Sequence, residues 1–310
     1  NIMSQEIESK IKKIPVVRNL MYFTKKIKLP WLEGLSLYDL LEIYIIGVVN
    51  GAISYRAGAI AFSFFMALFP FALFILNLIP IIPIEGFKQD FLRFVEESVP
   101  PNTFEAISSI IQDITNNSYG NLLSSGFILS SFLMANGLNA ILGGFENSHH
   151  VILKRGFFRQ YLVALGMSLL LTFLLIFTVA TIVIFEIFIQ KIKIQDVLNE
   201  NIQIMVIGRY VFFMLMILVT TSILFKFGTR ETKKNSFISI GSVFTTILII
   251  LSSYAFGIWV VRFSKYNELY GSIGTLLIMM FYIWLNCMIL LLGFELNATI
   301  NKLKRRNLFT

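Results

Sequence analysis

Long apolar runs separated by short polar segments dominate the hydrophobic pattern of this chain. Six runs reach the ~20 residues that an α-helix needs to cross a hydrocarbon core of about 30 Å; they lie near 57–82, 122–142, 161–189, 203–225, 237–261 and 272–297. The strict polar and apolar alternation that is typical of strands in a membrane barrel is absent. The pattern therefore predicts an all-α, polytopic membrane protein with six transmembrane helices.

The positions of the basic residues orient these predicted helices. The chain has 26 Lys and Arg against 18 Asp and Glu, a formal net charge of +8. With six crossings and a cytoplasmic N-terminus, eighteen basic residues fall in inner segments and six in outer segments. Cytoplasmic loops carry such an excess of Lys and Arg. We therefore expect both termini in the cytoplasm.

An apolar stretch at residues 36–54 precedes the first predicted span. Ser36 suits the N-cap of a helix, and Asp39 falls in its first turn. A crossing here would move the seven basic N-terminal residues to the outer side. We therefore predict a helix that lies at the inner membrane surface or is partly inserted.

Composition narrows the class of protein further. Hydrophobic residues make up 56% of the chain and charged residues only 14%, whereas a soluble domain carries about 25% charged residues. This excludes a cytosolic enzyme, a disordered protein and a disulfide scaffold. Cys287 is the single cysteine and can form neither an intrachain disulfide nor a cysteine metal site. No cleavable signal peptide is expected, because the first apolar run begins near Leu40.

The domain organisation predicted from this pattern is simple. Residues 1–35 form a basic cytoplasmic N-terminus with an amphipathic surface helix, 36–300 form the membrane domain, and 301–310 form a basic cytoplasmic tail. In the outer segment 84–121, apolar residues at helical spacing predict a second amphipathic helix, which either packs as part of the loop or covers a cavity: Phe104, Ile107, Ile110, Ile111 and Ile114.

Two sequence blocks resemble the YihY/virulence factor BrkB family of bacterial inner-membrane proteins. The first runs from Tyr55 to Pro70 and the second from Tyr254 to Ala298; Asn136, Asn139 and Asn147 around the second span add to the likeness. The resemblance covers nearly the whole chain from about residue 35. It implies a protein of the bacterial cytoplasmic (inner) membrane. Some members have been labelled tRNA-processing ribonuclease BN, and others are linked to serum resistance or envelope lipid handling.

The residues themselves give the ribonuclease label little support. Metal-dependent RNA hydrolysis needs a cluster of His and carboxylate ligands, but the chain has only two histidines, the adjacent His149 and His150. Nucleotide-binding, hydrolase and metal motifs are absent, as is a basic patch with interleaved aromatic residues. We expect no catalytic residues, metal site, cofactor or nucleic-acid partner, and ribonuclease activity is a remote alternative.

Four charged residues within or bordering the spans are the main functional candidates, because a charge at the centre of a transmembrane helix costs about 2.5–3.5 kcal/mol. Arg56 and Glu295 lie at the inner ends of the first and last spans, and we predict that they pair and close the inner side of a central cavity. Glu186 and Arg209 are predicted to pair on the outer side. The alternative is that both pairs are structural, or that the side chains snorkel to headgroups.

Polar residues and a proline add candidates for the cavity lining. Pro70 lies inside the first span, where it removes a backbone donor; that helix is either broken, as in transporters, or simply kinked. Other candidates for the lining are Ser63, Asn77, Asn136, Asn139 and Asn297. A cluster at the outer turn between the last two spans serves either function or a tight turn with interfacial tyrosines: Tyr266, Asn267, Tyr270 and Gly271.

The sequence thus predicts a protein that binds or transports an amphipathic envelope molecule, such as a lipid, through a central polar cavity. Membrane lipids are the expected partners, and small residues at helical spacing permit a homo-oligomer. The alternative is a non-transporting scaffold for envelope assembly, in which the polar residues only lock the helices together.

Overall fold

The computed structural model describes residues 36–50, 52–78, 89, 93, 120–148, 150–194, 199–230, 236–262 and 272–307. The regular elements in this part of the chain are helices: α3 (Leu37–Asn50), α4 (Ile53–Leu78), α7 (Gly120–Glu146), α8 (Phe157–Ile194), α9 (Asn199–Gly228), α10 (Ile240–Arg262) and α12 (Ser272–Asn307). The predicted all-α membrane fold is confirmed. The predicted amphipathic helices within 1–35 and 84–121 lie outside the described residues.

Each of the six predicted spans corresponds to one helix, although the ends differ. The largest difference is at the C-terminus, where α12 continues through Asn307 and includes most of the predicted tail. By length and composition, four helices in the described ranges can cross a membrane, through Phe157–Ile182, Ile207–Gly228, Ile240–Trp259 and Leu276–Leu303. A shorter apolar stretch lies at Ile53–Leu68 in α4. The count of six crossings stays a prediction.

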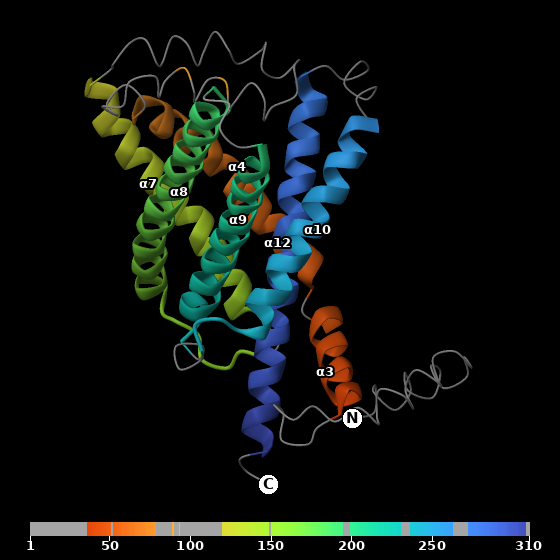
Figure 1. The fold of residues 1–310 in the computed structure, drawn as a ribbon. Helices are drawn as coiled ribbons and strands as arrows, with labels where there is room; N and C mark the ends of the chain where they lie inside the picture. Colours follow the sequence, from red (N-terminus) through yellow and green to blue (C-terminus); the bar gives the residue numbers. More distant parts are fainter. Residues whose placement is uncertain are drawn as a thin grey trace.

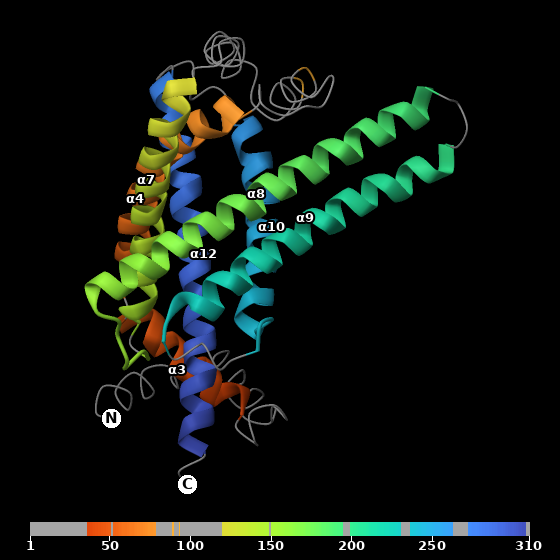
Figure 2. The same cartoon turned by 90° about the vertical axis from the view of Figure 1, so that its left-hand side faces the viewer.

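The six long helices alternate in direction, and α12 lies among them (Figure 1). It packs against α3, α4, α7 and α10. The helices α8 and α9 form a long hairpin that leans away from the others (Figure 2). The start of α3 and the end of α12 lie at the same end of the molecule, which we call the basic end because its described residues include Lys154, Arg155, Arg159, Arg230 and Lys302.

A cluster of three phenylalanines joins α7, α9 and α12. Phe145 and Phe294 stack with ring centroids 4.2 Å apart, and Phe225 meets both rings edge-on at 5.7 and 5.9 Å. Such aromatic pairs stabilise by about 0.5–1.5 kcal/mol beyond their burial. Because Phe145 precedes Glu146 and Phe294 precedes Glu295, the packed rings fix the backbone that carries both of these buried carboxylates.

The helices α10 and α12 cross at a contact between two glycines. A Cβ at Gly293 would overlap the Thr245 hydroxyl oxygen, and a Cβ at Gly241 would overlap the Gly293 carbonyl oxygen. Asn297 accepts a 2.8 Å hydrogen bond from the Gly241 N–H and donates another of 2.8 Å to the Ser239 hydroxyl. Free N–H groups at the start of a helix need such acceptors. Asn297 therefore ties the first turn of α10 to α12.

The predicted helix at 36–54 is α3, and it is docked on α12 at the basic end. The Tyr44 hydroxyl donates to the Leu292 carbonyl oxygen at 3.3 Å, and Leu40 packs against the cluster of Ile300 and Leu303. Ala52 between α3 and α4 has φ 46°, in the left-handed region that L-residues rarely adopt. This turn lets α3 change direction before α4 begins. The depth of α3 in the membrane stays a prediction.

Candidate functional site

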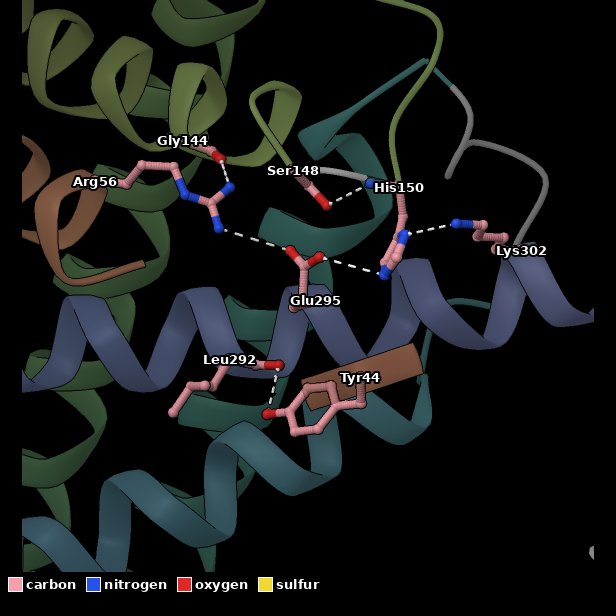
Figure 3. A network of polar contacts seen from close by, with 8 residues as sticks. All are labelled: Tyr44, Arg56, Gly144, Ser148, His150, Leu292, Glu295 and Lys302. Atoms are coloured by element: carbon pink, nitrogen blue, oxygen red, sulfur yellow. Dashed lines mark hydrogen bonds and ion pairs between the residues drawn. The ribbon is translucent and has the colours of Figure 1, made fainter. Parts of the chain in front are cut away.

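Four side chains at the basic end form what we call the charge cluster: Arg56, His150, Glu295 and Lys302 (Figure 3). Glu295 on α12 is fully buried, and Arg56 at the start of α4 is 8% exposed. The Arg56 Nη2 atom lies 3.6 Å from Glu295 Oε2, and Arg56 Nη1 donates to the Gly144 carbonyl oxygen at 2.8 Å. The predicted contact between Arg56 and Glu295 is therefore present. Their role in lining a cavity stays a prediction.

His150 connects this buried ion pair to the surface. Its Nε2 atom lies 3.7 Å from Glu295 Oε1, and its Nδ1 atom lies 3.3 Å from the Lys302 Nζ atom. The His150 ring is buried, whereas Lys302 is exposed. The His150 backbone N–H donates to the Ser148 hydroxyl at 3.2 Å and helps to position the ring. The cluster thus leads from a fully buried carboxylate to a lysine in contact with solvent.

Arg56 and Glu295 attract each other as opposite charges, but several of their polar atoms lack hydrogen bonds. Both carboxylate oxygens of Glu295 are buried without a donor at hydrogen-bond distance, and the Nε and Nη2 atoms of Arg56 are buried without an acceptor at that distance. A buried ion pair offsets the cost of removing its charges from water only when its remaining polar atoms are also satisfied. The ion pair of Arg56 and Glu295 is therefore buried without a full set of hydrogen bonds.

A second buried ion pair anchors the loop between α7 and α8. The Arg155 Nη1 atom lies 3.5 Å from Glu146 Oε1, and the Arg155 backbone N–H donates to Glu146 Oε2 at 3.1 Å. Arg155 also donates to the carbonyl oxygens of Gly228 at 2.6 Å and Phe227 at 2.8 Å. These carbonyls end α9, where a cation is favourable. Burial lowers the pKa of Arg155, and the Glu146 carboxylate opposes that shift.

This anchor yields a stability prediction. Arg155→Met leaves the buried Glu146 without the guanidinium group and removes two hydrogen bonds from the end of α9, so we expect a loss of about 2–4 kcal/mol in unfolding free energy. Arg155→Lys keeps the charge but cannot reach several acceptors with a planar fork, so we expect an intermediate loss. Thermal unfolding of both variants in detergent checks whether Arg155→Lys is less stable than the parent protein and more stable than Arg155→Met. Equal stability of Arg155→Met and the parent protein would contradict the anchor.

Comparison with known proteins now gives the family. The model of the family described as Virulence factor BrkB matches residues 47–308, which is most of the chain. The chain belongs to the BrkB family. It is 28% identical over 255 residues to a ribonuclease-like protein, YfkH of Bacillus subtilis (strain 168), covering 81% of this chain and 90% of that relative. A UPF0761 membrane protein of Coxiella burnetii (strain Dugway 5J108-111) is 25% identical over 247 residues, covering 77% of this chain and 85% of the relative.

The resemblance to the BrkB family is thus confirmed, and so is an integral, multi-pass membrane protein. No solved structure matches the chain significantly. In this BrkB-family chain, Arg56 comes from the first sequence block and Glu295 from the second. The fold brings the two blocks together through the contact of α4 with α12.

The structure places the other predicted lining residues in several different surroundings. Asn297 belongs to the α10 contact described above, and the Ser63 hydroxyl donates to the Ala59 carbonyl oxygen of its own helix at 3.0 Å. Asn136 and Asn139 are half-buried on α7, and Asn139 lies beside the Gln160 amide group of α8. None of these contacts joins the charge cluster.

The first long helix is not broken at its proline. The helix α4 runs without interruption from Ile53 to Leu78 and includes Pro70 and Asn77. Because a proline removes one backbone donor but fixes a helical φ, a helix can pass through it with only a kink. The prediction of a helix broken at Pro70 is therefore wrong. The side chains of Pro70 and Asn77 lie outside the described part.

The predicted outer-side residues are only partly described. Arg209 on α9 is half-buried, and its guanidinium lies 5.5 Å from the centre of the Tyr210 ring. Glu186 lies on α8, but its side chain is outside the description, so its pairing with Arg209 stays a prediction. The whole outer-turn cluster also lies outside the described residues: Tyr266, Asn267, Tyr270 and Gly271.

Sequence reasoning missed three residues that the fold buries near the basic end. The sequence pattern assigned no site role to His150, Arg155 or Glu146. The sequence does contain a signal for a polar cluster at this position: Glu146 directly follows an apolar run, and His150 and Arg155 come within nine residues of it. Their burial depends on α4, α9 and α12 closing over the loop, which no local pattern indicates. In the described ranges, no group of three or more His, Cys, Asp or Glu is placed to hold a metal ion.

Proposed function

We propose that this BrkB-family protein binds or transports an amphipathic envelope molecule, such as a lipid, and that the charge cluster contacts its polar headgroup. The observation that carries the proposal is the buried, under-satisfied pair of Arg56 and Glu295 between α4 and α12. Charged residues inside a membrane protein usually face a partner or a wet path because burial is expensive. A headgroup with both charges, or with hydroxyl groups, supplies the missing partners.

The surface of the α8 and α9 hairpin supports an amphipathic rather than a fully polar ligand. Several large apolar side chains on these two helices are more than 45% exposed, including Phe173, Phe177, Phe213 and Met214. In a membrane such side chains contact acyl chains. A molecule with a polar head and apolar tails can therefore remain in hydrocarbon while its head reaches the interior of the helix bundle.

The orientation and location form part of the same proposal. The basic end gathers Lys and Arg residues from two loops and from the end of α12, and such an excess marks the cytoplasmic side. We propose that the basic end, with both termini, faces the cytoplasm and that the protein lies in the bacterial inner membrane. The charge cluster then opens toward the inner leaflet.

Two experiments test this function. Mass spectrometry of lipids that remain bound to the purified protein is expected to show enrichment of one class over the bulk membrane. Reconstituted vesicles with a fluorescent analogue of that class should show flux that falls at least tenfold in Arg56→Glu and in Glu295→Arg. The swapped double variant should recover part of it, because it restores opposite charges. Absence of both enrichment and flux would refute the proposal.

The competing role is a non-transporting scaffold for envelope assembly. In that case the single and swapped variants change protein stability and partner capture, while bound lipid stays at bulk composition. The ribonuclease-like name belongs to the Bacillus relative, and we do not propose that activity here. Incubation of labelled tRNA precursor with the purified protein and Mg²⁺ or Mn²⁺ tests it directly. Crosslinking in the membrane tests for a homo-oligomer.

A further inference from the structure

The base of the α8 and α9 hairpin gathers positive charge outside the charge cluster. Arg155 holds the end of α9 through the carbonyl oxygens of Phe227 and Gly228. Arg230 follows Gly228 by two residues, and Arg159 lies in the first turn of α8, four residues after Arg155. Both Arg159 and Arg230 are exposed. The contacts of Arg155 with α9 therefore bring these two arginines to the base of the hairpin (Figure 2), which we call the hairpin root.

The charge at the hairpin root is unbalanced in sign. Glu146 forms an ion pair with Arg155. Burial lowers the pKa of Arg155, the Glu146 carboxylate opposes that shift, and the nearby charges of Arg159 and Arg230 lower it further. In the sequence, residues 147–185 contain three Lys and Arg and no Asp or Glu, and residues 226–236 contain four Lys and Arg against one Glu. These two segments therefore bring an excess of positive charge to the root.

Large apolar side chains lie exposed beside these cations. Phe157 and Phe158 begin α8 and are 73% and 83% exposed, and their ring centroids are 5.7 Å apart. Leu162 follows Phe158 by one turn on the same face of the helix and is also exposed. The segment of α8 that can cross a membrane begins at Phe157. These side chains therefore lie at the edge of the span, where hydrocarbon meets the lipid headgroups.

We propose that the hairpin root binds an anionic phospholipid, whose phosphate group contacts Arg159 and Arg230 and whose acyl chains lie along Phe158 and Leu162. Guanidinium groups bind phosphate oxygens through paired, charge-assisted hydrogen bonds. Cations next to exposed apolar side chains match a lipid, whereas a nucleic acid or an acidic protein would leave the phenylalanines without a partner. The site is separate from the charge cluster, and this inference does not require the transport role proposed above.

A bound phosphate changes the interactions at the hairpin root. Without an anion, Arg159 and Arg230 repel Arg155 and each other where α8 begins and α9 ends. A phosphate group between them replaces this repulsion with attraction and ties the first turn of α8 to the end of α9. The lipid therefore stabilises the hairpin, whereas the same two arginines do not stabilise the protein when no anion is present. This reversal distinguishes a lipid site from arginines that only support the fold.

Native mass spectrometry of the purified, delipidated full chain measures the binding. We expect phosphatidylglycerol to bind at least tenfold more tightly than phosphatidylcholine with the same acyl chains. The double variant Arg159→Gln with Arg230→Gln should bind phosphatidylglycerol about 25-fold more weakly, since each basic residue near a lipid surface contributes about fivefold. Its affinity for phosphatidylcholine should not change. Equal affinity of the parent protein for the two lipids, or an unchanged preference in the double variant, would overturn the proposal.

A single-residue comparison controls for the loss of charge. Arg159→Gln should weaken the binding of phosphatidylglycerol about fivefold, and it also serves if the double variant does not fold. Arg93 is an exposed arginine in the segment between α4 and α7, so Arg93→Gln removes the same charge away from the hairpin root. We expect no effect from Arg93→Gln. Equal losses in the two variants would show a general effect of net charge and would contradict the site.

Thermal unfolding separates a bound lipid from other anions. Phosphatidylglycerol should raise the unfolding temperature of the parent protein but not of the double variant, and in lipid-free detergent the double variant should be at least as stable as the parent. Phe157→Ser with Phe158→Ser should reduce the effect of the lipid. Inorganic phosphate or tRNA should not replace it. Equal stabilisation by inorganic phosphate would indicate a free-anion site, and equal stabilisation by tRNA a nucleic-acid site; either result would contradict the proposal.

The same variants keep this inference apart from the proposed function. Enrichment of anionic lipid that is lost in Arg159→Gln with Arg230→Gln but kept in Arg56→Glu supports the hairpin root. Enrichment that persists in that double variant and is lost in Arg56→Glu belongs to the charge cluster and counts against the root. Either proposal can therefore fail without the other.

Discussion

Arg56→Met is expected to lower the free energy of unfolding by about 3–5 kcal/mol, because it leaves Glu295 fully buried without its charge partner. The substitution keeps much of the side-chain volume, so loss of packing contributes little. The measurement is thermal unfolding in detergent with a thiol-reactive fluorophore. Cys287 is the chain's single cysteine and is buried, so it reports exposure of the core.

The control for this experiment is the double variant Arg56→Met with Glu295→Leu. Replacement of both members of a buried ion pair by apolar residues is often neutral or stabilising, so we expect the double variant to recover most of the loss. The comparison separates stability from function, since the recovered protein still lacks the charge cluster. A double variant as unstable as the sum of both single changes would show that the two residues do not interact.

Gly293→Ala is expected to destabilise the protein by about 1–3 kcal/mol or more, because the added Cβ overlaps the Thr245 hydroxyl and meets the Gly241 carbonyl oxygen at 2.9 Å. A backbone oxygen in the opposing helix cannot move away as a flexible side chain does. The helices α10 and α12 must therefore separate, which also strains the bonds of Asn297 to the start of α10. The same unfolding assay, which follows exposure of Cys287, measures the loss of stability in Gly293→Ala.

Gly257 on α10 provides the matched control, since nothing lies within 4 Å of a Cβ added there. Gly257→Ala should leave stability unchanged or raise it by up to about 1 kcal/mol, the usual gain in helix propensity. Thr245→Ala in the Gly293→Ala background removes the overlapping oxygen and should restore part of the stability. If Gly293→Ala and Gly257→Ala behave alike, the close crossing of α10 and α12 is wrong.

The sequence predicted the helices well because membrane helices are long and apolar, and this signal is local. It also predicted that Arg56 and Glu295 meet. That prediction needed only their opposite charges, their positions at corresponding ends of the first and last spans, and the high cost of an isolated charge in hydrocarbon. It could not give the partners from the loop, since burial of His150 and Arg155 depends on several helices closing around residues 147–156.

Two further differences between the predictions and the structure, at Pro70 and Asn297, also arise because tertiary packing is not visible in a local sequence pattern. Pro70 carries a strong local signal for a break, but the rest of α4 remains helical on both sides of it. Asn297 was interpreted as a lining residue, whereas both ends of its amide are used by the first turn of α10. An asparagine at a helix crossing and an asparagine at a binding site look the same in a sequence.

The length of α8 has a consequence for the membrane around the protein. Its apolar segment Phe157–Ile182 has 26 residues and rises about 39 Å at 1.5 Å per residue, which exceeds a hydrocarbon core of about 30 Å. Hydrophobic matching therefore favours an inclined helix or a locally thicker bilayer, and Figure 2 shows the α8 and α9 hairpin inclined to α12. Thinner bilayers should incline the hairpin further and thicker bilayers should raise it, so acyl-chain length becomes a determinant of the protein's shape.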